Sequence, residues 1–156
     1  MAEEKSTWLN GPSIPNDYAG GMAPRWPGEF LGLPKNGAGS LASIMRRVGG
    51  IAFDWFICLF LATIIERLWH FAGVSTTTLL LFFVLGVVSV SLFARTPGQS
   101  IMRMGVARLD KPGTRVAFWQ ALVRTLLTVF IFPPVIVDAD GRGMHDRATG
   151  TAVILG

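Results

Sequence analysis

The chain has 156 residues, the size of one domain, and it is 51% hydrophobic but only 15% charged. About a quarter of the residues of a soluble domain are charged, so this composition excludes an ordinary water-soluble protein. A net charge of +4 would suit nucleic acid in a soluble protein, but here we attribute it to Lys and Arg beside membrane spans and expect no nucleic-acid partner.

Residues 1–42 are rich in proline and glycine, as in Ala23-Pro24-Arg25-Trp26-Pro27-Gly28, and we predict an irregular N-terminal tail. Because this segment lacks the apolar region of a secretory signal, we expect no signal peptide. Its aromatic residues leave two interpretations open. The tail either has no fixed structure, or its aromatic side chains lie along lipid headgroups or a partner protein.

Residues 43–156 are predicted to form one all-α membrane domain with two firm transmembrane helices. The first span covers about residues 43–71 and the second about residues 77–94. Between His70 and Arg95 there are 24 consecutive uncharged residues, more than the roughly 20 that a helix needs to cross the hydrocarbon core. Because the connection between the spans is short, the two helices should be antiparallel neighbours.

Lys and Arg are concentrated before the first span and after the second. The first 47 residues carry five of them, and the basic loop, residues 95–115, carries another five against Asp110 alone. On the side of the short connection there is only Arg67, near the end of the first span, and Glu66 balances it. By the positive-inside rule, the N-terminus and the basic loop are expected on the cytoplasmic side of a multi-pass membrane protein.

The third apolar stretch, residues 116–137, is interrupted by Arg124 and later by Pro133-Pro134. A proline disfavours helix at the residue before it, so a regular helix should end near this pair. One interpretation is a third span with Arg124 facing the other helices, which places the C-terminus outside. The other is an interfacial or re-entrant helix that turns back at the prolines, which places the tail, residues 138–156, on the cytoplasmic side.

Two short segments outside the spans have the composition of β-strands. Residues 105–110 precede the turn Lys111-Pro112-Gly113, and residues 151–155 lie near the C-terminus. A lone strand leaves its backbone groups unpaired, so we predict that these segments pair in a small two-stranded extramembrane sheet. The pairing requires both segments on one face of the membrane, which favours the cytoplasmic placement of the tail.

Asp54 is the most informative single residue, because an ionised carboxylate at membrane depth is costly and needs a partner or a function. Arg47 precedes it by seven residues, so the two share one helix face about 10 Å apart along the axis. Gly50 lies between them and leaves room for another helix. We predict that Asp54 pairs with Arg47 or Arg124, either to fix helix packing or within a proton- or cation-binding site.

Asp146, in the run His145-Asp146-Arg147, is expected to tie the tail to Arg46, Arg47 or the basic loop by accepting hydrogen bonds. A histidine beside an aspartate would suit acid–base catalysis, but no nucleophile accompanies the pair. We therefore predict that the protein is not an enzyme.

Three further features have simple structural interpretations. The single cysteine, Cys58, offers no internal disulfide and no cysteine metal cluster, and we expect no cofactor. Asp138 and Asp140 flank Ala139, and we interpret them as a polar turn rather than as a cation site. Gly86 in the second span is small enough to let another helix approach.

Several motifs in a fixed order together resemble the bacterial RDD family of membrane proteins, which is named for one arginine and two aspartates. The family's three positions correspond here to Arg47, Asp54 and Asp146. The Pro/Gly-rich tail resembles the N-terminal extension of one branch of that family. The resemblance covers about residues 44–156 and is carried by Arg47 with Asp54, Thr96-Pro97-Gly98-Gln99-Ser100, Val123-Arg124-Thr125-Leu126 and Met144-His145-Asp146-Arg147-Ala148-Thr149-Gly150-Thr151-Ala152-Val153.

The resemblance implies a location in the bacterial plasma membrane, contact with the lipid bilayer, and a connection with exchange of sodium or other monovalent cations for protons. Two functions follow as alternatives. The protein is a transporter or transporter component that uses Asp54 as its ionisable group, or it is a non-catalytic accessory or assembly subunit of a larger membrane complex. Either way we expect a homo-oligomer or a complex with other chains, because the chain has little room for a fourth span.

Overall fold

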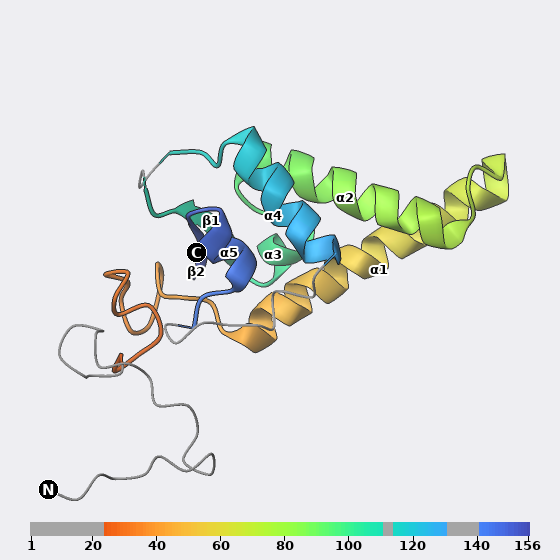
Figure 1. Ribbon diagram of the computed structural model, residues 1–156. Helices are drawn as coiled ribbons and strands as arrows, with labels where there is room; N and C mark the ends of the chain where they lie inside the picture. Colours follow the sequence, from red (N-terminus) through yellow and green to blue (C-terminus); the bar gives the residue numbers. More distant parts are fainter. Residues whose placement is uncertain (1–23, 111–113, 131–140) are drawn as a thin grey trace, which may run out of the picture.

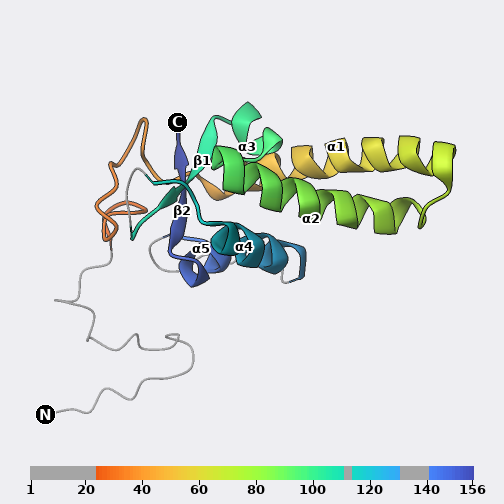
Figure 2. The same cartoon turned by 90° about the horizontal axis from the view of Figure 1, so that it is seen from above.

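The computed structural model describes residues 24–110, 114–130 and 141–156. Most of the described residues are helical, and two short strands form one small sheet. The small elements gather at one end of a long helical hairpin, whose other end extends beyond them (Figures 1 and 2). In chain order the elements are α1 (Ile44–Trp69), α2 (Val74–Phe93), α3 (Pro97–Ile101), β1 (Met104–Arg108), α4 (Phe118–Phe130), α5 (Met144–Ala148) and β2 (Thr151–Leu155).

The hairpin consists of α1 and α2, which pack against each other along their length (Figure 1). Ser43 caps the start of α1 by accepting a hydrogen bond from the backbone N–H of Arg46. The carboxylate of Glu66, near the end of α1, accepts hydrogen bonds from the backbone N–H of Ala72, at 2.9 Å, and from the Thr77 hydroxyl. These bonds hold the short connection closed, and the predicted antiparallel neighbours are confirmed.

Both long helices are long and apolar enough to cross a membrane. Only 22% of the most apolar window of α1 and 28% of that of α2 are buried, so most of their apolar side chains lie on the outside of the molecule. The buried residues of α1 instead follow one stripe, three or four residues apart: Arg47, Gly50, Asp54, Cys58, Ala62 and Glu66. The helix therefore turns its polar and small residues toward its neighbours.

The predicted strand pairing is confirmed. β1 and β2 are antiparallel, with Met104 opposite Leu155 and Arg108 opposite Thr151. The chain just before α1 lies along β2 as well, because the backbone N–H of Ala42 donates to the carbonyl of Val153 at 2.9 Å. A small core of Ala42, Met104 and Val153 lies there.

Within the described residues α4 has 13 residues, whereas a spanning helix needs roughly 20. It packs against α2, where Gly86 faces Thr125 so closely that a Cβ on Gly86 would lie 2.7 Å from the Thr125 methyl. The predicted approach of another helix at Gly86 is thus present. Pro133-Pro134, Asp138 and Asp140 lie outside the described residues, so the choice between a third span and a re-entrant helix stays a prediction.

Candidate functional site

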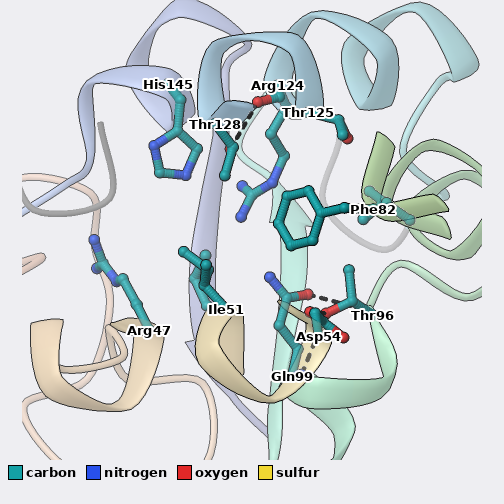
Figure 3. Close-up of a pocket in the computed structure, with 13 residues that line it drawn as sticks. Arg47, Ile51, Asp54, Phe82, Thr96, Gln99, Arg124, Thr125, Thr128 and His145 are labelled. Atoms are coloured by element: carbon teal, nitrogen blue, oxygen red, sulfur yellow. Dashed lines mark hydrogen bonds between the residues drawn. The ribbon is translucent and has the colours of Figure 1, made fainter. Parts of the chain in front are cut away.

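A cavity of about 50 Å³ lies where the hairpin meets the small elements. Since a cavity of roughly 10–15 Å³ already holds one water molecule, this one has room for a few waters or one small ion. The residues that line it come from α1, α2, α3, α4, α5 and β2, with Thr96 directly before α3. Figure 3 shows the polar side chains that line it, which are Arg47, Asp54, Thr96, Gln99, Arg124, Thr125, Thr128 and His145.

Asp54 is held by the start of α3. Its Oδ2 accepts a hydrogen bond from the Thr96 hydroxyl, and its Oδ1 accepts one from the backbone N–H of Gly98 at 2.7 Å. Thr96 also caps α3, because its hydroxyl oxygen accepts from the N–H of Gln99, while the Gln99 side-chain oxygen accepts from the N–H of Thr96. Asp54 is 4% exposed, and both oxygens of its carboxylate accept hydrogen bonds from neutral donors.

The predicted ion pair of Asp54 with Arg47 or Arg124 is therefore wrong. Among the described residues, no lysine or arginine nitrogen lies within ion-pair distance of Asp54. The helical spacing does place Arg47 and Asp54 on one buried stripe. However, nearly two helical turns separate the two residues. The start of α3 lies closer to Asp54 and supplies the hydrogen-bond donors for its carboxylate. In Figure 3 the Arg47 side chain lies well apart from Asp54.

Arg124 of α4 pairs instead with Asp146 of α5. Both side chains are buried, and Asp146 Oδ1 also accepts a hydrogen bond from the Thr151 hydroxyl at 3.2 Å. His145 Nε2 lies 3.4 Å from the same oxygen. Asp146 thus ties the tail down as we expected, but to α4. The predicted partners Arg46, Arg47 and the basic loop were wrong.

Arg47 is buried in the cavity wall, with 3% of its surface exposed. None of its three guanidinium nitrogens has a hydrogen-bond partner among the described residues. Its charge acts on Arg124, which is also buried, so two like charges face the same cavity. Its neighbour Arg46 is exposed.

Sequence reasoning missed the roles of Thr96, Gln99 and Thr151. A signal for the first two was present, because Thr96-Pro97-Gly98-Gln99 has the pattern of a capping box with proline at the first helical position. That pattern predicts the start of a helix but not the carboxylate that the helix meets. Thr151 carries no comparable signal, since a threonine in a strand is ordinary.

Within the described residues, no three His, Cys, Asp or Glu side chains form a group that could hold a metal ion. Cys58 is buried four residues after Asp54, on the same stripe of α1. No protein-family model, no curated protein and no solved structure matches the chain.

Proposed function

We propose that the protein is an RDD-type integral membrane protein whose α1–α2 hairpin spans the bacterial plasma membrane. Two observations support this. The apolar side chains of both helices face outward, where lipid would cover them and water would not. Lys and Arg are concentrated in the sequence segments before α1 and after α2, which by the positive-inside rule supports a cytoplasmic location for that end of the hairpin and for the N-terminus.

Within that membrane, the protein acts as a non-enzymatic component of a transport system that exchanges a monovalent cation for a proton, with Asp54 as the ionisable group. The observation that carries this function is the environment of Asp54. The carboxylate is buried beside a cavity, and its hydrogen-bond donors are a hydroxyl and a backbone N–H rather than a cation. A carboxylate in such a place is able to take up either a proton or a metal cation.

The chemistry needs no covalent step. Protonated Asp54 releases its proton as a cation enters the cavity, and the cation then balances the carboxylate. The hydroxyl of Thr96 and the side-chain amide of Gln99 also line the cavity and offer oxygen atoms of the kind that alkali cations prefer. When the cation leaves, Asp54 takes up a proton again.

The two helices in the described residues that could span a membrane have mostly exposed surfaces and do not enclose a pathway across a bilayer. A transport function therefore requires further helices, supplied by copies of this chain or by other subunits. The outward apolar side chains of α1, such as Phe56 and Phe60, are large enough to pack against such helices as well as against lipid.

The test uses everted membrane vesicles that contain the protein and carry a pH gradient. Adding sodium or potassium should dissipate the gradient, and Asp54→Asn should abolish the response. Asp110→Asn is the matched control, because Asp110 is an exposed carboxylate bound to Arg108 and lies away from the cavity. An unchanged response in Asp54→Asn would remove Asp54 from the mechanism.

A second function, an accessory or assembly subunit, is favoured by one specific observation. Both oxygens of Asp54 hold α3 in place, which is a structural role that needs no ion. On this hypothesis, wild-type vesicles show no cation response, and the chain purifies in mild detergent with a stoichiometric partner. A wild-type chain that purifies without a partner and still exchanges cations would contradict it.

A further inference from the structure

We propose that the cavity binds one small oxyanion of the phosphate type at Arg47. The starting observation is that the guanidinium of Arg47 is buried, and its three nitrogens have no hydrogen-bond partner among the described residues. Arginine does not lose its proton in proteins, so burial cannot be relieved by neutralisation. An unpaired buried charge is strongly destabilising, and an anion in the cavity would remove that cost.

In the described part of the chain, neither Asp54 nor Asp146 is bound to Arg47, because both carboxylates have other partners. Asp54 accepts hydrogen bonds from Thr96 and Gly98, at the opposite side of the cavity from Arg47 (Figure 3). Asp146 pairs with Arg124 through one oxygen. Its other oxygen has no hydrogen-bond partner among the described residues, but Asp146 is not part of the cavity wall.

The surroundings of Arg47 favour an anion over a water cluster. Arg124 from α4 and His145 from α5 line the same cavity as Arg47. A guanidinium presents its N–H groups as a planar fork, which matches two oxygens of a phosphate or carboxylate. The cavity, at about 50 Å³, holds one group of that size.

Two sources supply this chemistry at the cytoplasmic end of a membrane hairpin. One is free phosphate, and the other is the phosphate of a phospholipid headgroup. The proposed site does not depend on cation exchange, because it rests on Arg47 rather than on Asp54. Its test therefore measures binding of the anion and not transport. If the binding test fails, the proposal of cation exchange at Asp54 is unaffected, and the reverse also holds.

The first experiment measures thermal unfolding of the full chain in a neutral detergent after removal of lipid. Inorganic phosphate is added at constant ionic strength, with sodium chloride as the balancing salt. Phosphate should raise the unfolding temperature by a few degrees at concentrations well above its Kd, because it binds only the folded state. Arg47→Met keeps the length of the side chain and removes the charge, so it should abolish the shift.

Arg46→Met is the matched control, because it removes the same charge from the adjacent but exposed residue. This variant should keep the phosphate shift. In phosphate-free buffer, Arg47→Met should unfold at the same temperature as the wild type or higher, since it removes an unpaired buried charge. A lower unfolding temperature for Arg47→Met, with no phosphate effect in the wild type, would show that a carboxylate of the chain itself pairs with Arg47 and would overturn the proposal.

The second experiment distinguishes the two sources by native mass spectrometry of protein purified with its lipid. A phospholipid retained by the wild type and by Arg46→Met, but lost from Arg47→Met, would support the proposal and identify the headgroup as the anion. Phosphate stabilisation without retained lipid would support it with free phosphate. The proposal is overturned if Arg47→Met keeps the phosphate shift, or if the wild type shows neither the shift nor retained lipid.

Discussion

Gly98, in the first turn of α3, lies directly against the carbonyl oxygen of Gly50 on α1, and a methyl group on Gly98 would overlap that oxygen. This close approach brings the Gly98 N–H and the Thr96 hydroxyl within hydrogen-bond distance of Asp54. The position of the central carboxylate thus depends on two glycines that are far apart in the sequence.

Gly98→Ala should therefore destabilise the protein. The added methyl would also lie 3.0 Å from the carboxyl carbon of Asp54, so α3 must shift and both hydrogen bonds to Asp54 must weaken. We expect a loss of about 1–3 kcal/mol, measured by thermal unfolding in detergent. Gly105→Ala is the control, because its nearest new contact is an ordinary 3.6 Å to the carbonyl of Ala94. Equal unfolding temperatures for the two variants would contradict the tight approach.

Gly86→Ala should disturb the contact between α2 and α4, because the new methyl would lie 2.7 Å from the Thr125 methyl. The expected cost is again about 1–3 kcal/mol of stability. Thr125→Ala removes the two atoms in closest contact, so the double variant should regain most of the loss. If the double variant is no more stable than Gly86→Ala, the helices do not meet at these residues.

Arg124→Gln should lower the stability of the protein far more than Arg108→Gln, which removes the same charge from a pair at the surface. It leaves Asp146, which is completely buried, without its cation, and breaking such a pair costs about 3–5 kcal/mol. Adding Asp146→Asn should recover much of that loss, because no unpaired charge then remains buried. Arg108→Gln, which breaks the exposed pair with Asp110, should leave the unfolding temperature almost unchanged.

The register of β1 against β2 predicts which pairs of introduced cysteines can form a disulfide. Gly105 and Ile154 lie directly opposite each other, and opposed residues in an antiparallel pair have the Cα separation of a disulfide. In a Cys58→Ser background, Gly105→Cys with Ile154→Cys should form an internal disulfide on mild oxidation, detected by peptide mass mapping. Gly105→Cys with Ala152→Cys is two residues out of register and should cross-link much more slowly. Equal cross-linking would show that the register is wrong.

The proposed topology places the C-terminus on the cytoplasmic side. A cysteine at Gly156, in a Cys58→Ser background, should resist a membrane-impermeant thiol reagent in intact cells and react after permeabilisation. A cysteine placed in the connection between α1 and α2, such as Ala72→Cys, should show the opposite pattern. Labelling of the Gly156 position in intact cells would mean that a third segment spans the membrane.

Some of the candidate site was predictable because the underlying signals are local. Arg47, Gly50 and Asp54 share a buried stripe, as their spacing along one helix requires. The pairing of β1 with β2 was also predictable, since each strand needs a partner and the described chain has two such segments. What failed was the step from a shared face to an ion pair, because a shared face does not bring two side chains into contact.

By itself, the sequence determined two long apolar helices, a short connection between them and two strands that pair, because length, hydropathy and β-composition act within a segment or between neighbouring segments. Only the tertiary structure decided which charge meets which. Asp54 meets Thr96 and Gly98, Arg124 meets Asp146, and Arg47 is buried without a partner among the described residues. The physical reason is distance, because hydrogen bonds form only within about 3 Å and such approaches are set by the packing of backbones far apart in the chain.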